Sequence, residues 1–139
     1  SFPCWSNANI AGKKATEWIA EKTDDLEAAK EKIYTNVRDV AYRIIENKGA
    51  TYYGVATVLA RICRHIIEDS HSIITVGACL EGEYGLSGVY MGTPCVIGRN
   101  GIEKIIEVEL DEKEKELMEK SFKALKEVQD KGMEKVREN

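Results

Sequence analysis

The spacing of apolar residues divides the chain into a helical first half and a second half of strands followed by one more helix. In residues 24–48 and 51–68 apolar positions recur every three or four residues, the period of one face of an α-helix. Asp24 or Asp25 suits the N-cap of the first helix, and Gly49 suits its left-handed C-cap. The face that we expect this helix to bury carries Ile33, Val37, Val40, Ala41, Ile44 and Ile45.

The second helix should begin near Thr51 and end near Glu68, directly after the short joint Gly49–Ala50. Because its apolar stripe is nearly continuous, we expect the two helices to pack together about that joint. A shorter helix is expected near Lys14–Glu21. The stripe of the second helix consists of Val55, Val58, Leu59, Ile62, Cys63, Ile66 and Ile67.

The second half of the chain changes to the composition of β-strands. Residues 72–80 are β-branched and apolar, which predicts a strand, and Gly82-Glu83-Tyr84-Gly85 reads as a turn. Two further strand pieces are expected at 88–91 and 95–98. Gly92 and Pro94 should interrupt them, as at a bulge or a sheet edge.

A hairpin and a last helix complete the predicted fold. Asn100-Gly101 is a turn signal because both central residues of such a turn need positive φ, and 102–110 is the predicted return strand. Asp111, with Glu114 three residues later, forms the pattern of a capping box, and the tail should fray after Gly132. The apolar face of the last helix carries Leu117, Met118, Ser121, Phe122, Leu125 and Val128. The predicted class is α+β, with long helices packed on a small antiparallel sheet.

Composition indicates one soluble globular domain over residues 1–139. The chain is 43% hydrophobic and 32% charged, and its net charge of −4 argues against nucleic acid, which needs a basic surface. No apolar run reaches membrane-spanning length, and we expect no signal peptide. The lack of an initiator Met fits a fragment or a processed chain. The four cysteines form no CxxC pair, which favours reduced thiols over a disulfide scaffold.

The sequence contains no complete catalytic set. It has no GxGxxG or Walker loop, and its carboxylate clusters at 24–25, 81–83 and 112–116 suit solvated surface. His65 and His71 have no evident ligand or carboxylate partner, so we predict neither a metal site nor catalysis from them. Thr51 has two open interpretations. Its hydroxyl can cap the second helix, or it can belong to a site where the helix N-terminus holds a carboxylate substrate.

Four segments, in order, resemble the lactate/malate dehydrogenase family. They are WSNANIAG (5–12), NKGATYYGVA (47–56), CLEGEYGLSGVYMGTPCVIGRNGIEKIIEVEL (79–110) and DEKEKELMEKSFKALKEV (111–128). Together they cover nearly the whole chain, and they are similar to the stretch after the catalytic-histidine loop, the substrate helix, the hairpin sheet and the last helix of the family. The KGATYYG form is closest to the bacterial L-lactate dehydrogenases of that family.

The resemblance implies the C-terminal catalytic domain of an oxidoreductase that uses NAD to interconvert pyruvate and L-lactate in glycolysis or fermentation. The family's catalytic histidine, its substrate-binding arginine and its NAD-binding Rossmann domain match positions upstream of Ser1, so this chain should lack them and be inactive alone. By resemblance, Thr51 is a substrate-binding residue and Val55 packs against the nicotinamide ring of NAD. Tyr42 matches a tyrosine that is phosphorylated in some bacterial members.

The resemblance also implies a cytoplasmic homotetramer, without nucleic-acid or membrane partners. Many bacterial members are activated by fructose 1,6-bisphosphate, whose basic ligands would also lie upstream. Malate dehydrogenase, or another L-2-hydroxy-acid dehydrogenase, remains an alternative, although Thr51 favours lactate. A non-catalytic subunit-contact module is a further alternative, because an isolated copy should expose apolar surface and associate.

Overall fold

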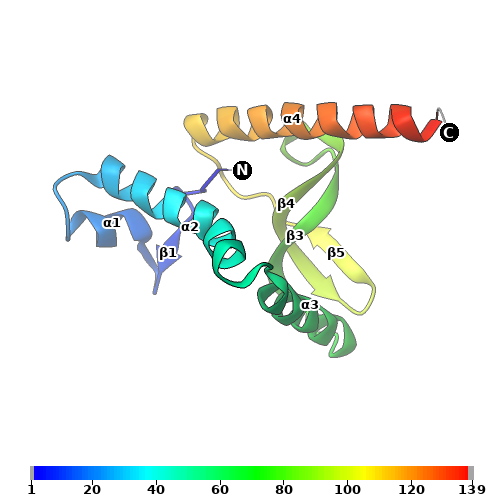
Figure 1. The fold of residues 1–139 in the computed structure, drawn as a ribbon, viewed down its shortest axis with the longest axis horizontal. Coiled ribbons are helices and arrows are strands. Elements are labelled where there is room, and N and C mark those ends of the chain that lie inside the picture. The colour runs from blue at the N-terminus through cyan, green and yellow to red at the C-terminus, as the bar shows by residue number, and fades with distance from the viewer. Residues whose placement is uncertain (1, 138–139) are drawn as a thin grey trace. The chain divides into compact units, whose positions relative to one another are not determined.

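A computed structural model describes residues 2–137 (Figure 1), which form two compact units. The helical unit comprises Pro3–Arg61, and the sheet unit comprises Phe2 with residues 62–137. The elements of the chain are β1 (Asn9–Ile10), β2 (Lys13–Lys14), α1 (Ala15–Ala20), α2 (Leu26–Lys48), α3 (Tyr52–Ile67), β3 (Ser72–Glu81), the 3-10 helix η1 (Glu83–Gly85), β4 (Ser87–Gly98), β5 (Gly101–Ile105) and α4 (Glu112–Arg137). Helix α3 begins in the helical unit and ends in the sheet unit.

The ends of helix α2 are confirmed as predicted. The Asp25 carboxylate accepts a hydrogen bond from the Ala28 N–H at 2.9 Å, which satisfies one of the free donors of the first turn. At the other end Gly49 has a φ of 78°, and its N–H donates to the Ile45 carbonyl. Glycine tolerates this left-handed conformation because it has no Cβ. Helix α3 follows after the Gly49–Ala50 joint.

The prediction that α2 buries its apolar face is wrong for this chain. Val37 is 67% exposed and Val40 is 43% exposed, and no described residue of Pro3–Arg61 is fully buried. The physical reason is that α2 and α3 do not pack along one another, contrary to our expectation. The apolar pattern of α2 therefore predicts a helix face that the helical unit does not cover by itself.

The sheet has the antiparallel order β3-β4-β5. Strand β4 runs without interruption through Gly92 and Pro94, so the predicted break there is wrong. The Pro94 carbonyl accepts a hydrogen bond from the Ile106 N–H at 2.8 Å, just beyond the end of β5. Because the N–H and C=O of a strand residue point to the same side, the missing N–H of Pro94 faces Ile106 and not β3, and the Ile106 carbonyl accepts from the Tyr84 hydroxyl instead.

The predicted hairpin between β4 and β5 is confirmed, but its turn is displaced by one residue. Arg99 and Asn100 occupy the turn, Gly98 pairs with Gly101, and Gly101 alone takes the positive φ, of 90°. Strand β5 ends at Ile105, and residues 106–110 lie outside the ladder. The predicted alternation persists there, because the apolar residues of 106–110 are half-buried and the two glutamates are exposed.

The capping box at the start of α4 is confirmed in both directions. The Asp111 carboxylate accepts from the Glu114 N–H at 2.8 Å, and the Glu114 carboxylate accepts from the Asp111 N–H at 3.2 Å. The helix continues through Gly132 to Arg137, so the predicted fraying is wrong for residues 133–137, and residues 138–139 lie outside the described part of the chain. A single glycine costs a helix only about 1 kcal/mol, which the surrounding strong helix formers tolerate.

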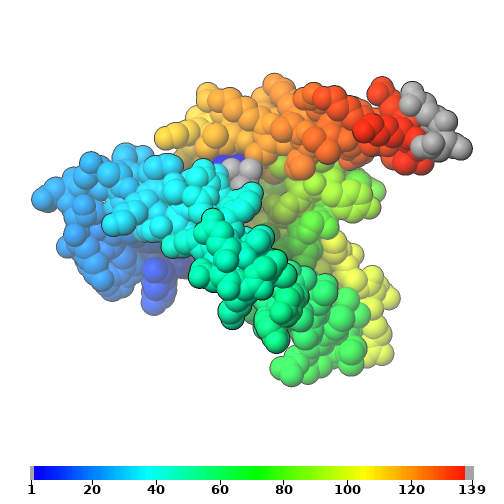
Figure 2. Space-filling model, viewed as in Figure 1, coloured from blue at the N-terminus to red at the C-terminus, as the bar shows by residue number. Residues whose placement is uncertain are grey.

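The core of the sheet unit lies against the sheet, packed in part by Met118 of α4 and in part by Ile66 of α3, and Figure 2 shows α4 as a continuous orange-to-red ridge. Two clusters of buried side chains make up this core. One contains Leu80, Val89, Met91 and Met118, and the other contains Ala78, Cys95 and Ile97, with Ile66 of α3 packed against it. The α+β class, with long helices on a small antiparallel sheet, is therefore confirmed. None of the helices in the described part of the chain is both long and apolar enough for a membrane span.

Candidate functional site

The helical unit contains an open groove between the C-terminal half of α2 and the N-terminal half of α3. Its volume is about 860 Å³, within the range of small-molecule sites. Thr51 and Val55, the two residues predicted to meet substrate and cofactor, both line it. The structure thus brings these two residues into one groove, although their roles remain predictions.

Thr51 immediately precedes α3 and is half-buried, whereas Val55 lies one turn into the helix and is 57% exposed. Within residues 2–137, the Thr51 side chain has no hydrogen-bond partner, so the capping interpretation of its hydroxyl is not seen. A free hydroxyl at a helix N-terminus can bind an anionic group, because the backbone N–H groups and the helix dipole favour negative charge there.

The walls of the groove are mainly apolar, and its polar side chains are partly engaged elsewhere. Arg43 donates from Nη2 to the Asn36 carbonyl at 3.0 Å, and Asn47 donates from Nδ2 to the Arg43 carbonyl at 2.7 Å. The apolar walls include Val40, Ile44, Val58 and Leu59. Such a groove can shield a flat apolar group from water and hold one polar group near Thr51. Its lining residues include no histidine, carboxylate or thiol, and its titratable side chains other than Arg43 are Lys48, Tyr52 and Tyr53.

Tyr42, the predicted modification site, lies on α2 and is 67% exposed. It is not among the residues that line the groove. Its phenol is accessible in this chain, as a modification would require, and its phosphorylation stays a prediction.

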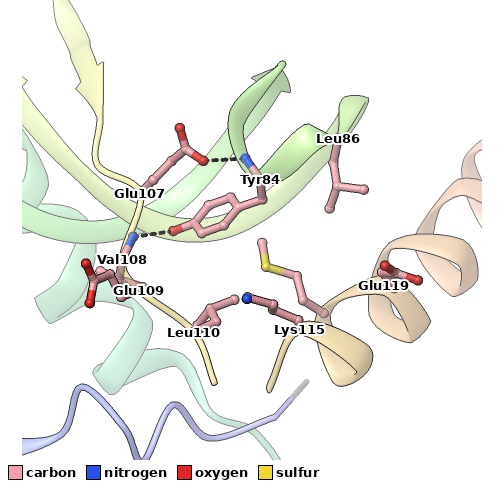
Figure 3. A pocket seen from close by; sticks show the side chains of 9 residues that line it. Tyr84, Leu86, Glu107, Val108, Glu109, Leu110, Lys115 and Glu119 are labelled. Atoms are coloured by element: carbon pink, nitrogen blue, oxygen red, sulfur yellow. Dashed lines mark hydrogen bonds between the residues drawn. The ribbon is translucent and has the colours of Figure 1, made fainter. Parts of the chain in front are cut away.

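The sheet unit has a second pocket of about 510 Å³, centred on Tyr84 (Figure 3). Tyr84 has a φ of 56°, and its N–H donates to the Glu107 carboxylate at 2.6 Å. Its hydroxyl accepts from the Val108 N–H at 3.0 Å and donates to the Ile106 carbonyl at 3.3 Å. The residues predicted to form only a turn therefore anchor the irregular segment 106–110, which explains why that segment stays ordered outside the ladder.

The polar side chains of this second pocket have structural roles. The Tyr84 hydroxyl is bonded to backbone groups and also lies 3.3 Å from the Thr93 hydroxyl. Lys115 pairs with Glu112 at 2.7 Å, and this hydrogen bond raises the pKa of the lysine. A nucleophile paired with a general base is not found among the residues that line this pocket.

The carboxylate clusters predicted as solvated surface are exposed with few exceptions. Glu114 is the clearest exception, since its side chain is only 4% exposed and forms part of the cap of α4. Glu83 accepts a hydrogen bond from the Glu81 N–H at 2.7 Å, and this bond lowers the pKa of the Glu83 carboxyl.

The prediction that the histidines have no partners is wrong. His71 lies 3.1 Å from Glu103 and 3.9 Å from Asp69, measured from Nε2 to a carboxylate oxygen. His65 meets the Ser70 hydroxyl through Nδ1 at 2.8 Å, and its Nε2 is buried without a partner. The spacing Asp-x-His at 69–71 was a visible signal for the first group, but nothing in the sequence indicated Glu103.

The lactate/malate dehydrogenase family, in its α/β C-terminal domain, matches residues 1–136 of this chain. L-lactate dehydrogenase 1 of Enterococcus faecalis is 48% identical over 127 residues, which are 91% of this chain and 39% of that protein. The chain therefore spans about two fifths of the length of the curated relatives that it matches.

Solved structures agree with this match. The minor L-lactate dehydrogenase from Enterococcus mundtii superposes with a TM-score of 0.85 at 31% identity, covering 92% of this chain and 41% of that one. The malate dehydrogenase from Aeropyrum pernix superposes with a TM-score of 0.81 at 28% identity, covering 91% of this chain and 40% of that one.

Proposed function

Because the chain belongs to the lactate/malate dehydrogenase family and matches its C-terminal domain, we propose that it forms the substrate-side domain of an NAD-dependent L-lactate dehydrogenase. The observation that carries this proposal is the groove between α2 and α3, where Thr51 and Val55 lie together. Similarity to an L-lactate dehydrogenase at 48% identity supports lactate and pyruvate as the substrates.

Each of the two residues has a role that its surroundings suit. The free hydroxyl of Thr51, at the N-terminus of α3, is proposed to contact the bound 2-oxo acid. Val55, one turn later in the mainly apolar groove, is proposed to pack against the nicotinamide ring of NAD. A branched apolar side chain excludes water from the path of the hydride and favours the less charged, reduced ring.

The groove can bind and shield, but the proposed reaction also needs a proton donor, a group that grips the substrate carboxylate, and a dinucleotide-binding domain. We propose that these are supplied outside this chain, by other parts of a longer polypeptide, and that the 139-residue chain alone is inactive. The complete enzyme would be a cytoplasmic homotetramer, as the family resemblance implies.

Malate dehydrogenase remains the second candidate, favoured by the likeness to the Aeropyrum pernix enzyme. A non-catalytic subunit-contact module is the third, and the exposed apolar face of α2 favours it. The three candidate functions predict different activities when this domain is joined to the N-terminal part of a known dehydrogenase.

The test is a pair of chimeras in which this chain replaces the matching segment of the Enterococcus faecalis lactate dehydrogenase or of the Aeropyrum pernix malate dehydrogenase. We expect the first chimera to oxidise NADH with pyruvate and the second to be poor with oxaloacetate. Circular dichroism and size-exclusion chromatography would establish that both are folded. A folded first chimera without pyruvate activity would contradict the proposal, and efficient oxaloacetate reduction by the second would favour malate dehydrogenase. Two folded but silent chimeras would favour the contact module.

A further inference from the structure

Three side chains with metal-binding donor atoms meet at one end of the sheet unit. Asp69 lies in the loop after α3, His71 directly precedes β3, and Glu103 lies on β5. One donor atom from each residue lies within 4.8 Å of the other two. No part of the substrate groove contributes to this cluster, since that groove lies in the helical unit.

The His71 ring is oriented as a metal ligand would be. Its Nδ1 lies 2.9 Å from the Asp69 carbonyl oxygen, so that nitrogen carries the proton and donates it. The other ring nitrogen, Nε2, then faces the carboxylates of Glu103, at 3.1 Å, and Asp69, at 3.9 Å. A lone pair directed at carboxylate oxygens is unfavourable unless a proton or a cation lies between them. Histidine ligands of metals are commonly fixed in this manner, through a backbone carbonyl on the other nitrogen.

A group outside the cluster bonds one carboxylate, and a glycine leaves room for the other. The Asp69 carboxylate accepts a hydrogen bond from the backbone N–H of Arg99 at 2.7 Å. The Glu103 carboxylate lies over Gly98, where an added Cβ would come within 2.3 Å of its Oε1. Gly98 is buried and does not have a positive φ, so its backbone does not require glycine. Independently of the hydrogen bonds within the cluster, the missing side chain at this position makes the space that the Glu103 carboxylate fills.

The charge of the cluster favours a cation. Two carboxylates face one imidazole, and the Arg99 guanidinium lies 3.9 Å from the second oxygen of the Asp69 carboxylate. Metal–nitrogen and metal–oxygen bonds of roughly 2.0–2.2 Å place neighbouring donors roughly 3 to 3.5 Å apart. The His71–Glu103 separation of 3.1 Å falls in that range, whereas the His71–Asp69 separation of 3.9 Å exceeds it, and all three donor atoms lie within 4.8 Å of one another, so the side chains must draw together to bind an ion.

We propose that Asp69, His71 and Glu103 bind a divalent transition-metal ion, with water completing its coordination. One imidazole and two carboxylates suit Zn²⁺, Co²⁺ or Ni²⁺ better than Ca²⁺ or Mg²⁺, which prefer oxygen ligands alone. The bound ion links the loop after α3, the start of β3 and strand β5, and so stabilises this end of the sheet. This role does not depend on the proposed dehydrogenase function.

The test is isothermal titration calorimetry of the full, untagged 139-residue chain with Co²⁺ and with Zn²⁺. We expect one saturable site and a rise in melting temperature with metal. Glu103→Gln, which keeps the shape of the side chain over Gly98, and His71→Gln should each weaken binding by roughly tenfold or more. His65→Gln is the matched control and should leave binding unchanged, because that ring meets Ser70 and not the cluster.

Spectroscopy of the Co²⁺ form separates this site from the four cysteines of the chain. The proposal expects visible bands without the intense near-ultraviolet absorption of a cobalt–thiolate bond. It is overturned by thiolate absorption, by binding that survives both His71→Gln and Glu103→Gln in folded protein, or by the lack of any saturable binding. In the last case His71 is a protonated ion-pair partner of Glu103 and not a ligand.

Discussion

The two units of this chain differ in how they use their apolar residues. In the sheet unit, Leu80, Val89 and Cys95 are each at most 1% exposed, beneath α4 or α3. In the helical unit no described residue is fully buried, although α2 and α3 carry regular apolar stripes. The comparison shows that an apolar stripe predicts a helix in both units, but it predicts a core only where a second layer covers it.

The uncovered unit is also the one that holds the proposed binding residues. Thr51 and Val55 lie in a groove whose walls would be costly to leave in water if the chain had no further partner. The sheet unit, with its capping box, its Tyr84 anchor and its closed core, has the features of a scaffold. We therefore expect substitutions in the sheet unit to change stability and those in the groove to change activity.

The largest effect should come from opening the core of the sheet unit. Leu80→Ala should lower the free energy of unfolding by about 2–5 kcal/mol, because it removes a fully buried side chain and leaves a cavity. Leu59→Ala is the matched control in the helical unit, where the side chain is 56% exposed, and should cost no more than about 0.5 kcal/mol. Urea denaturation of the whole chain measures both. Equal costs would show that the helical unit has a core of its own.

Thr51→Ala tests the groove. In the lactate dehydrogenase chimera it should lower kcat/KM for pyruvate by about tenfold, since it removes one polar contact to the substrate. The dissociation constant of NADH and the stability of the protein should change little. Unchanged pyruvate kinetics would remove Thr51 from the site, and an equal loss of NADH affinity would indicate a general disturbance of α3.

Asp111→Ala tests the cap of α4 in the sheet unit. It should destabilise the sheet unit by about 1 kcal/mol, because the Glu114 N–H then loses its partner in the first turn of α4. Asp111→Asn, which keeps an acceptor at this position, is the control and should recover most of that loss. Thermal unfolding followed by circular dichroism distinguishes the two variants, and equal melting temperatures for parent and Asp111→Ala would mean that the cap contributes nothing.

Val55→Asn should have the smallest effect and the opposite kinetic signature to Thr51→Ala. A polar side chain against the nicotinamide ring would keep water there and raise the dissociation constant of NADH about threefold, which corresponds to about 0.7 kcal/mol. The effect is modest because Val55 is already 57% exposed in this chain. Fluorescence titration of the chimera with NADH measures it, with Val55→Ile as the apolar control. An unaltered dissociation constant for Val55→Asn would remove Val55 from the cofactor site.

Much of the local structure could be predicted from the residues themselves. The caps of α2 and α4 follow from Asp25, Gly49 and the Asp111–Glu114 pair, because capping depends on groups that are close in sequence. Strand β4 could not be predicted correctly, since whether Pro94 breaks a strand depends on which side its missing N–H faces. That side is set by the register of β4 with its two neighbouring strands, and β5 ends before it reaches Pro94.

The candidate sites also differ in whether their residues are close together in the sequence. Thr51 and Val55 were named from the family resemblance, and their roles remain predictions. That both line one groove follows from their spacing of one helical turn. Glu103 could not be assigned to His71, because the loop after α3 and strand β5 meet only when the sheet forms.

The amino-acid sequence by itself determined the helical periods, the caps, the hairpin and the family of this protein. The tertiary structure alone decided which apolar faces are buried, how Pro94 fits into a continuous strand, and which distant side chains meet around Tyr84 and His71. The physical reason is that local conformation depends on hydrogen bonds and side-chain spacing within a few residues. Burial and side-chain clusters depend instead on the packing of segments that are far apart along the chain.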